Sequence, residues 1–516
     1  MDESQYVIEM NNITKAFGTF KANDNINLKV KKGEIHALLG ENGAGKSTLM
    51  NILSGLLEPT SGSININGKE EEISNPTVAN KLGIGMVHQH FMLVDNFTVE
   101  ENIILGSEPT KSGVIDKKKA FDDIMAVSDR YGFKINPKEL VSNISVGMQQ
   151  RVEILKTLYR GAEILIFDEP TAVLTPQEID ELIEIMHGLV NEGKSIVLIT
   201  HKLDEIKAVA DRCTVIRRGK SIDTVNVADV TQQELADLMV GRSVSFKTPK
   251  GPSYPKEPVL KINDLVVKEN RGLDAVKGLS LDVHAGEVVG IAGIDGNGQS
   301  ELLQAIAGMR KVESGSIEIN GKDMTNKRPR EITEHSFGHV PEDRHRFGLV
   351  LPMTLSENIA LQTYYKAPLS KNGLLNYKAI NSHARKLIEE FDVRTPNELV
   401  PASALSGGNQ QKAIIAREID RNPELLMVAQ PTRGLDVGAI EYIHKRLIEQ
   451  RDSGKGVLVV SFELDEILNV SDRIAVMFDG NITGIVKASE TNEQELGLLM
   501  AGVPLEEVRK GAVAGE

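Results

Sequence analysis

The chain has 516 residues, 41% of them hydrophobic, which is ample for two separate cores of ordinary domain size. Its 59 Lys and Arg against 73 Asp and Glu give a net charge of −14, which argues against a broad nucleic-acid surface because phosphate binding relies on clustered cations. The one cysteine, Cys213, permits no intrachain disulfide, and no apolar run approaches the roughly 18–20 residues that span a bilayer, so we expect a protein that is neither secreted nor transmembrane.

The two halves of the chain carry the same sequence pattern. Residues 33–68 align with residues 286–321 without a gap, from GEIHALLG against GEVVGIAG to SGSINING against SGSIEING. Further along, LDEI at 203–206 matches LDEI at 464–467 after an insertion of eight residues in the second half. A repeat of domain size indicates an internal duplication and two homologous domains.

Short continuous apolar runs recur in both halves, as expected for parallel strands that are covered on both faces. They lie at 34–40, 163–169 and 195–200 in the first half and at 287–293, 424–430 and 456–462 in the second. The runs predict an α/β fold in each half. In open α/β sheets the functional groups lie at the carboxyl ends of the strands, so the polar residues that end these runs are the candidates for chemistry.

Prolines separate the halves. Four of them stand within residues 246–259, at a spacing that prevents a helix or a central strand and favours an extended connector. We therefore expect a first domain over 1–245, a linker over 246–258 and a second domain over 259–505. The last residues, 506–516, are rich in Gly and Ala without a pattern, and predict a flexible tail.

A phosphate-binding loop follows the first apolar run. Residues 40–47, GENGAGKS, fit GxxxxGK[ST] and stand between a predicted strand and the helical stretch STLMNILSGL. The glycines let backbone N–H groups curl around phosphate oxygens, Lys46 reaches the β- and γ-phosphates, and Ser47 can ligate Mg²⁺. The residues expected around the nucleotide are Gly40, Asn42, Gly43, Gly45, Lys46, Ser47 and Thr48.

Polar residues at the ends of three further runs complete the candidate catalytic set. Asp168 and Glu169 are adjacent carboxylates at a strand end, where Asp168 is expected to hold Mg²⁺ through its water shell and Glu169 to orient and deprotonate the attacking water. His201 ends the next run and is expected to contact the γ-phosphate. Gln89, after another apolar stretch, is expected to contact both Mg²⁺ and the water.

These residues, in this order, resemble the ATP-binding cassette (ABC) ATPases over nearly the whole chain. The resemblance assigns the Walker A, Q-loop, Walker B and switch positions to Lys46 with Ser47, Gln89, Asp168 with Glu169, and His201. It implies two tandem P-loop NTPase domains, each with a mainly parallel sheet core and a helical signature subdomain. Phe17 matches the aromatic residue that stacks on adenine, and a core phenylalanine is the equal alternative.

Members of this family bind ATP between two cassettes arranged head to tail, so that each site combines Walker motifs with the LSGGQ-type signature of the other cassette. LSGGN at 405–409 is close to this consensus, whereas ISVGM at 144–148 departs from it at three of five places. The resemblance therefore implies one intact site, in which the first-half Walker motifs face Ser406, Gly407, Gly408 and Asp436 of the second half.

The second half has lost the matching catalytic residues. Its Walker A, Q-loop, Walker B and switch positions hold Gln299 with Ser300, Glu342, Ala429 with Gln430, and Phe462. Gln299 cannot supply the charge-assisted bonds that Lys gives phosphates, each worth about 1.5–3 kcal/mol, and Gln430 has no basic oxygen for water. We predict one hydrolytic site per chain. The retained glycines leave weak or static nucleotide binding at the degenerate site open.

Two further segments have competing interpretations. The hydrophobic residues within 91–97 lie in a stretch that family members use to receive a coupling helix of a permease, and core packing is the alternative. The charged segment EDRHR at 342–346 has two histidines but no clear set of metal ligands, so a solvated or ion-paired loop is expected there instead of a metal or phosphate site.

Tandem cassettes in one chain with LSGGN and VPEDRHRFGLV resemble the ATPase subunits of bacterial importers for simple sugars and nucleosides. Segments 84–106 and 145–178 are most similar to the nucleoside branch, and a monosaccharide such as ribose or galactose is the alternative. The resemblance implies ATP and Mg²⁺ as cofactors, two transmembrane permease subunits and an extracellular solute-binding lipoprotein as partners, and no nucleic acid. It places the chain at the cytoplasmic side of the cell membrane, attached through the permeases.

A soluble tandem-cassette ATPase that acts on ribosomes is the less favoured alternative. Such proteins usually keep two intact sites and a long charged linker, whereas this chain has one intact site, a short proline-rich connector and a net charge of −14.

Overall fold

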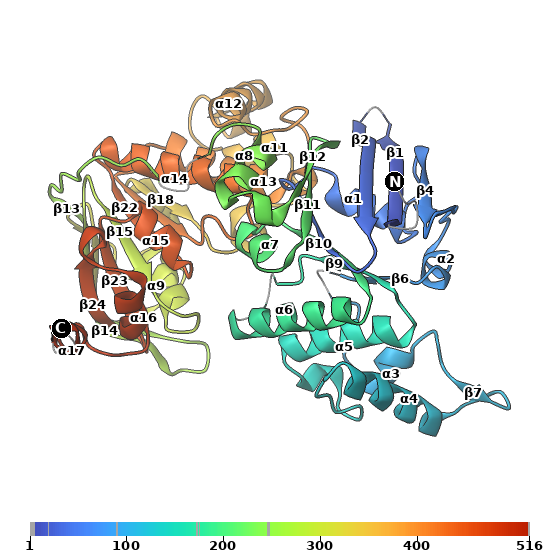
Figure 1. Cartoon of the computed structure of the whole chain (residues 1–516). Helices are drawn as coiled ribbons and strands as arrows, with labels where there is room; N and C mark the ends of the chain where they lie inside the picture. The colour runs from blue at the N-terminus through green and yellow to red at the C-terminus, as the bar shows by residue number, and fades with distance from the viewer. Residues whose placement is uncertain are drawn as a thin grey trace. The chain divides into compact units, whose positions relative to one another are not determined.

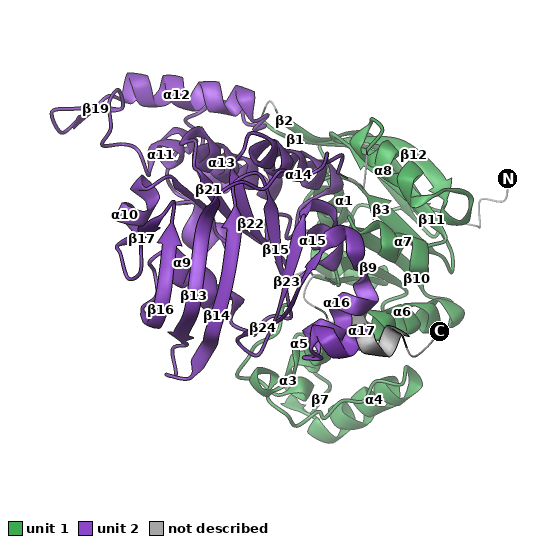
Figure 2. Cartoon of the chain, turned by 90° about the vertical axis from the view of Figure 1, so that its left-hand side faces the viewer, with its two compact units in different colours: residues 1–244 green, residues 245–516 purple. Residues whose placement is uncertain are grey.

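The computed structural model describes residues 6–18, 20–88, 91–171, 174, 176–244 and 248–513. The chain divides into two compact units, residues 1–244 and 245–516, which are coloured green and purple in Figure 2.

The first unit is built on a six-stranded sheet with the order β12-β11-β3-β10-β9-β6, in which only β11 and β12 pair antiparallel. Its strands are β3 (Ile35–Leu39), β6 (Ile84–Val87), β9 (Ile164–Asp168), β10 (Ser195–Thr200), β11 (Arg212–Arg217) and β12 (Lys220–Asn226). Every residue of β3 and β10 is buried, and so is β9 up to its last residue, Asp168. Burial on both faces explains why these strands are continuous apolar runs in the sequence.

Alternate residues of these strands belong to two separate cores. Ile166 packs in one core with Leu49 of α1 (Lys46–Leu53), and Phe167 packs in the other with Val152 of α5 (Val146–Tyr159). The first core also holds the antiparallel sheet β2-β1-β4-β5. Its strands are β1 (Tyr6–Phe17), β2 (Phe20–Lys31), β4 (Ser61–Ile66) and β5 (Lys69–Glu70).

Helices fill the remainder of the first unit, and Figure 1 shows α3, α4 and α5 together in one lobe with β7 at its tip. These elements are α2 (Pro76–Lys81), α3 (Val99–Ile104), α4 (Lys117–Arg130), α6 (Pro176–Asn191), α7 (Leu203–Val209), α8 (Gln232–Val240), the short helices η2 (Val141–Asn143) and η3 (Val227–Asp229), and the hairpin β7 (Thr110–Lys111) with β8 (Val114–Ile115).

The second unit repeats this plan. Its large sheet has the order β18-β21-β22-β15-β23-β24, which is the strand order of the first unit, and its antiparallel sheet has the order β14-β13-β16-β17 (Figure 2). The strands are β13 (Pro258–Lys268), β14 (Asp274–His284), β15 (Val288–Ala292), β16 (Val312–Ile319), β17 (Lys322–Asp323), β18 (Phe337–Val340), β21 (Leu425–Ala429), β22 (Gly456–Val460), β23 (Arg473–Phe478) and β24 (Asn481–Lys487), with a separate hairpin of β19 (Ser370–Lys371) and β20 (Leu374–Leu375).

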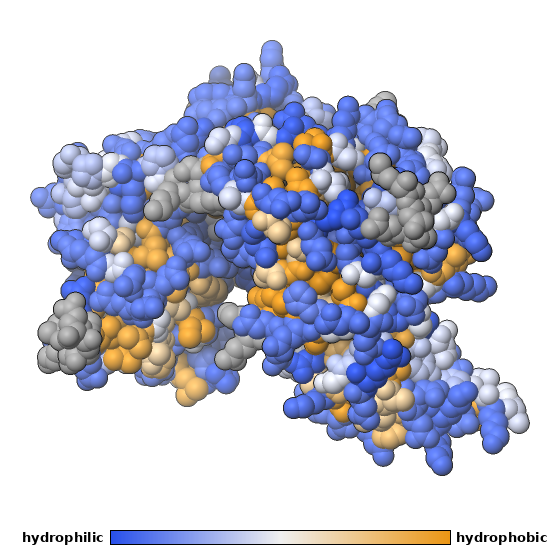
Figure 3. All heavy atoms as spheres, viewed as in Figure 1, coloured by the Kyte–Doolittle hydropathy of each residue, from blue (hydrophilic) through white to orange (hydrophobic). Residues whose placement is uncertain are grey.

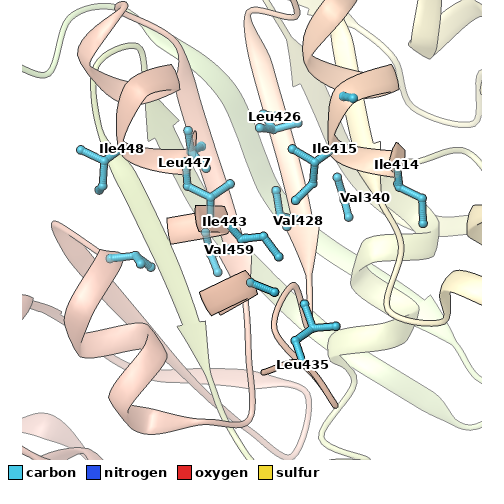
Figure 4. Close-up of a cluster of buried hydrophobic side chains, with 14 of the residues drawn as sticks. Val340, Ile414, Ile415, Leu426, Val428, Leu435, Ile443, Leu447, Ile448 and Val459 are labelled. Carbon is cyan, nitrogen blue, oxygen red and sulfur yellow. The ribbon is translucent and has the colours of Figure 1, made fainter. Parts of the chain in front are cut away.

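Helices cover the large sheet of the second unit, and Figure 4 shows Ile415 of α13 and Ile443 of α14 gathered with Val428 and Val459 of the sheet in one buried cluster. The helices are α9 (Gln299–Ile306), α10 (Pro329–Glu334), η4 (Arg344–Gly348), α11 (Leu355–Ala360), α12 (Tyr377–Glu390), η5 (Ala402–Ala404), α13 (Gly407–Asp420), α14 (Val437–Asp452), α15 (Leu464–Val470), η6 (Ala488–Glu490), α16 (Glu493–Met500) and α17 (Leu505–Val513).

The connector and the carboxyl end of the chain are more structured than a free linker and a free tail. Thr248 N donates to Asn469 Oδ1 at 2.8 Å, and Lys250 Nζ donates to the carbonyl oxygen of Ser471, so this part of the connector is tied to the second unit. At the end of the chain, Leu505 and Val508 of α17 pack against the core of that unit. The described part of the expected flexible tail is therefore helical.

Hydrophilic residues dominate the viewed face of both units, and hydrophobic residues gather there only in small patches (Figure 3). Within the described part of the chain, no helix combines the length and the apolar character that crossing a membrane requires.

Candidate functional site

The loop between β3 and α1 has the backbone of a phosphate-binding loop. Gly43 and Gly45 adopt φ values of 80° and 104°, in the left-handed region that favours glycine. A Cβ atom on Gly45 would lie 2.4 Å from the carbonyl oxygen of Ala22, and one on Gly40 would lie 2.3 Å from that of Ile216. The loop therefore depends on glycine, and it leads into the first turn of α1, whose N–H groups attract anions.

Lys46 lies inside this loop. The side chain is buried, and its Nζ donates to the carbonyl oxygens of Gly40 at 2.6 Å and Glu41 at 3.0 Å. Ser47 is exposed and Thr48 half-buried on the first turn of α1, and Asn42 is half-buried in the loop. The arrangement places the positive charge of Lys46 and the exposed hydroxyl group of Ser47 at the loop that the sequence assigns to phosphate and metal.

Asp168 and Glu169 stand at the carboxyl end of β9, as predicted. Glu169 has φ = 46°, a left-handed conformation that is unusual without glycine, and its N–H donates to the carbonyl oxygen of Ile199 at 2.9 Å. Its Oε1 lies 3.0 Å from Nδ1 of His201, and both side chains are mostly buried. The structure thus brings together the predicted general base and the predicted switch histidine, which are separated by 32 positions in the sequence.

The pKa values of these adjacent carboxyl groups move in opposite directions. Burial and the negative charge of Glu169 raise the pKa of Asp168 to about 6, and Lys46 opposes this only in part. Burial also acts to raise the pKa of Glu169, but the hydrogen bond with His201 and the charges of His201 and Lys46 outweigh it and lower the pKa. Lys46 therefore compensates the charge of Asp168 only in part, whereas His201 and Lys46 together favour the ionised form of Glu169.

A network beneath His201 was not predicted. Thr200 Oγ1 donates to Glu205 Oε2 at 2.9 Å, and Glu205 also accepts a hydrogen bond from Thr171, two residues after Glu169. Glu205 therefore ties the turn that carries His201 to the turn that follows β9. The signal was present in the sequence, because Glu205 belongs to the LDEI segment that recurs at 464–467.

Exposure bears on two of the open alternatives. The Phe17 side chain is 50% exposed at the end of β1, with Lys15 Nζ 5.4 Å from its ring centroid, so Phe17 is not a core residue. In segment 91–97, Met92 is 64% exposed and Phe97 is 39% exposed, which contradicts a core role for these two, whereas Leu93 is half-buried and packs against the core. Gln89 lies outside the described residues.

The two signature serines use their hydroxyl groups differently. Ser145 caps α5, since its Oγ accepts from the N–H of Met148 at 3.2 Å. Ser406 stands at the same position before α13 but makes no capping bond, and its Oγ accepts from Asn409 Nδ2 at 2.9 Å. The Ser406 hydroxyl therefore bonds to a side chain of α13 and leaves the backbone N–H groups of that helix uncapped.

Close packing explains the small residues that follow Ser406. A Cβ atom on Gly407 would lie 2.7 Å from Arg344 Nη2, and one on Gly408 would lie 3.2 Å from Ala439 Cβ. Asp436 is the N-cap of α14, where its Oδ1 accepts from the N–H of Ala439 at 2.9 Å. The predicted signature residues and Asp436 thus meet at the amino ends of α13 and α14.

The EDRHR segment is more ordered than the solvated or ion-paired loop that the sequence predicts. It forms the π-helical turn η4, capped by Asp343, whose Oδ1 accepts from the N–H groups of His345 at 2.9 Å and Arg346 at 3.0 Å. Asp343, His345 and Arg346 are exposed, as expected. Arg344 is half-buried beside Gly407 and donates from Nη1 to the carbonyl oxygen of Arg433 at 3.1 Å. Sequence reasoning missed this contact with the signature.

In the second unit the loop backbone is retained while the functional groups are replaced. Gly296 and Gly298 have φ values of 88° and 99°, and buried Gln299 donates from Nε2 to the carbonyl oxygen of Ile294 at 3.1 Å. Ser300 Oγ donates to Glu342 Oε2 at 2.9 Å. The strand β21 ends at Ala429, which supplies no carboxylate in the place of Asp168.

Gln430 keeps the backbone of Glu169 without its chemistry. It has φ = 46°, as Glu169 has, and its N–H donates to the carbonyl oxygen of Val460 at 2.7 Å. Its Oε1 accepts from the N–H of Phe462 at 3.4 Å, and its buried Nε2 has no hydrogen-bond partner among the described residues. No imidazole is available here, because Phe462 stands in the place of His201.

Residues 23–172 and 276–433 both match the family model described as "ABC transporter". This chain belongs to the ABC transporter family. It is 70% identical over 499 residues to "Nucleoside import ATP-binding protein NupA" of Lactococcus lactis subsp. cremoris (strain MG1363), an alignment that covers 97% of this chain and 99% of the relative. Since the family and its import ATP-binding proteins hydrolyse ATP, the chain is an ABC-type ATPase.

Other relatives carry related names. The chain is 64% identical over 98% of its length, and 99% of the relative, to "Guanosine import ATP-binding protein NupO" of Bacillus subtilis (strain 168). It is 44% identical, over 96% of each chain, to "Glucose import ATP-binding protein TsgD13" of Haloferax volcanii (strain ATCC 29605). Among solved structures, an archaeal ribosome recycling factor, aABCE1, matches 91% of this chain and 89% of its own with a TM-score of 0.57 and 20% identity, which shows a shared fold alone.

Proposed function

We propose that this chain hydrolyses ATP at one composite site and thereby energises the import of nucleosides through partner permeases. One observation carries the proposal. Four predicted catalytic residues lie in the first unit, whereas Ser406, the signature serine that makes no capping bond, lies in the second; the four are Lys46, Asp168, Glu169 and His201. In a head-to-tail arrangement of cassettes, the two intact parts belong to the same site.

Within that site, Glu169 acts as the general base. It takes the proton of a water molecule whose oxygen attacks the γ-phosphorus, and the products are ADP and phosphate. His201, whose Nδ1 lies 3.0 Å from Glu169 Oε1, would orient this carboxylate and donate to the γ-phosphate. Lys46 and the N–H groups of the loop bind the β- and γ-phosphates, and Ser406 and Gly407 bind the γ-phosphate from the other cassette.

The residues of the first unit also fit Mg²⁺. Asp168 is a mostly buried carboxyl group whose pKa is raised to about 6 by burial and by the negative charge of Glu169, and a divalent cation would supply further positive charge beside it. Ser47 offers a hydroxyl oxygen on the first turn of α1, and Gln89 completes the proposed set. When bound, the metal neutralises charge on the phosphate oxygens.

The partners follow from the proposed transport. The chain would bind two transmembrane permease subunits at the cytoplasmic face of the membrane, and an extracellular solute-binding lipoprotein would supply the solute. The exposed Met92 and Phe97 lie in the segment proposed to receive a permease coupling helix. Nucleosides are preferred to monosaccharides, because identity is 70% and 64% to relatives named for nucleoside and guanosine import, against 44% to one named for glucose import.

The test combines capture of partners with measurement of transport. The tagged Glu169→Gln chain, which traps the closed state, is purified from gently solubilised cells and its co-purifying proteins are identified by mass spectrometry. We expect polytopic permeases and a solute-binding lipoprotein. Uptake of radiolabelled guanosine and adenosine by cells carrying the wild-type chain should exceed that by Glu169→Gln cells, with labelled ribose and galactose as the comparison. Capture of ribosomal proteins without permeases, or uptake of sugars alone, would overturn the proposal.

A further inference from the structure

We infer that the second unit keeps its own site for a divalent cation and a nucleotide, in which Glu342 replaces the lost Walker B carboxylate as the metal ligand. The inference rests on the proposed function only in taking the loop of each unit to bind nucleotide phosphate. It reverses the simplest interpretation of Glu342, in which the change from Gln is one more defect of a degenerate site.

The two units carry a carboxylate at the ends of different strands that are neighbours in the sheet. In the first unit, Asp168 ends β9 and Gln89 follows β6; in the second, Ala429 ends β21 and Glu342 follows β18. The strands β6 and β9 are parallel neighbours, and so are β18 and β21. Because the carboxyl ends of neighbouring parallel strands lie side by side, the loss at Ala429 and the gain at Glu342 leave one carboxylate at the same edge of the sheet.

The contact of Glu342 with Ser300 gives two oxygen atoms the spacing that two ligands of one cation can have. Glu342 Oε2 lies 2.9 Å from Oγ of Ser300, on the first turn of α9, and Ser300 is the counterpart of the proposed ligand Ser47. Mg²⁺ binds oxygen atoms at about 2.0–2.1 Å in octahedral geometry, so its adjacent ligands stand about 2.9 Å apart. Mg²⁺ in nucleotide sites takes one or two protein oxygens together with phosphate oxygens and water, and Ser300 and Glu342 supply such a set.

The surroundings of this pair favour an anion. Gly296 and Gly298 hold the loop in the left-handed conformations of the first unit, so the N–H groups of the loop and of α9 face a phosphate in the same way. Gln430 follows β21, the strand next to β18; its side chain is 7% exposed, and its Nε2 is a buried donor without a partner among the described residues, which is unfavourable for a polar group. A phosphate oxygen would satisfy this donor.

The same residues explain why the nucleotide would be held and not hydrolysed. Gln430 carries an amide where Glu169 carries a carboxylate, so no general base stands next to the metal ligands. Glu342 cannot take this role while it binds the cation. The second unit would then keep a bound nucleotide without hydrolysing it, while turnover occurs at the other site.

Counting bound Mn²⁺ by electron paramagnetic resonance tests this inference on the full chain. Mn²⁺ serves as the probe for Mg²⁺, with a non-hydrolysable ATP analogue in excess. We expect two tightly bound Mn²⁺ ions per wild-type chain. Glu342→Met and Asp168→Asn should each weaken one of the two by about tenfold or more, since each removes a charged ligand from a different unit, and the double variant should bind neither tightly. Methionine is chosen at 342 because the first unit carries glutamine, a proposed metal ligand, at the matching position.

Controls separate the inference from its alternatives. Glu301→Gln removes a neighbouring carboxylate from the same turn of α9 and should leave both ions bound. These substitutions keep side chains of similar size, and thermal melting checks that the variants fold. If Glu342→Met leaves both ions bound, or if the wild-type chain binds one ion that only Asp168→Asn removes, Glu342 is a hydrogen-bonding partner of Ser300 and the inference is wrong. If Asp168→Asn has no effect, the proposed intact site is wrong instead.

Discussion

The two units share a scaffold and differ in what stands on it. Their large sheets have the same strand order, and the last glycine of each loop has nearly the same φ, 104° at Gly45 and 99° at Gly298. The residue after the Walker B strand has φ = 46° in both units, although it is Glu169 in one and Gln430 in the other. Packing and backbone have thus been retained in a unit whose catalytic side chains are gone.

This comparison shows that the strained backbone belongs to the fold. A left-handed conformation at a catalytic glutamate invites the interpretation that strain serves catalysis. Gln430 has the same conformation without a catalytic role, and in both units the N–H of this residue donates to the neighbouring strand, to Ile199 or to Val460. The turn geometry is therefore set by the sheet, and only the side chain decides whether the site can hydrolyse ATP.

The largest expected effect comes from making the first unit resemble the second. Glu169→Gln should reduce ATP hydrolysis by about 10²–10⁴-fold, because the general base is removed while volume and backbone are conserved. Steady-state phosphate release measures this. Adding Gln430→Glu to the variant should not restore activity, since the second unit also lacks the counterparts of Lys46 and His201. Substantial residual hydrolysis in Glu169→Gln, or rescue by the second change, would contradict the assignment of one hydrolytic site.

Next in size is the difference between the two signature serines. Ser406→Ala should lower turnover by about 10–10²-fold, as expected for loss of one hydrogen bond to a charged group, with little change in melting temperature because Ser406 does not cap α13. Ser145→Ala removes the cap of α5 and should cost about 1 kcal/mol of stability, with a much smaller effect on turnover. Equal kinetic effects of the two substitutions would argue against a single composite site.

The sequence predicted those parts of the molecule that are encoded by neighbouring residues. The apolar runs became buried strands because a covered parallel sheet needs them, and the loop at 40–47 needs its glycines because Gly40 and Gly45 approach other backbone closely. The order of motifs then placed Asp168, Glu169 and His201 at one edge of the sheet.

Contacts between distant segments were beyond the sequence. The bond between Ser300 and Glu342 joins residues 42 positions apart, and the contact of Arg344 with the Arg433 carbonyl joins residues 89 positions apart. The first contact depends on which strand ends are neighbours. The second depends on a π-helical turn that no local sequence pattern predicts. For the same reason Arg344 was expected in a solvated loop.

A smaller effect is expected on the pH dependence of stability. It comes from the carboxyl group of Asp168, whose counterpart in the second unit is Ala429. With a pKa of about 6, folded Asp168 keeps a proton that the unfolded chain has released above about pH 4, so stability falls as pH rises through 6. Between pH 5 and pH 7 the metal-free and nucleotide-free protein should lose on the order of 1 kcal/mol through this group. Chemical unfolding should show this loss in the wild type and not in Asp168→Asn. Parallel pH profiles of the two proteins would contradict it.

The smallest effect concerns the ring of Phe17. This ring is a further difference between the units, since the second unit has no aromatic residue between Pro258 and Asp274. A half-exposed ring at the end of β1 offers a face on which a purine can stack, and its loss should weaken nucleotide binding at the intact site by a few-fold. Because stacking does not depend on the hydrogen-bonding edge of the base, Phe17→Ala should raise the KM for ATP and for GTP by the same factor, with kcat unchanged. Phe17→Tyr should retain both values, since it keeps the ring. A change in kcat would instead mean that Phe17 positions the phosphate-binding loop at 40–47. The aromatic residue at the end of β1 would then distinguish the units in catalysis and not in nucleotide affinity.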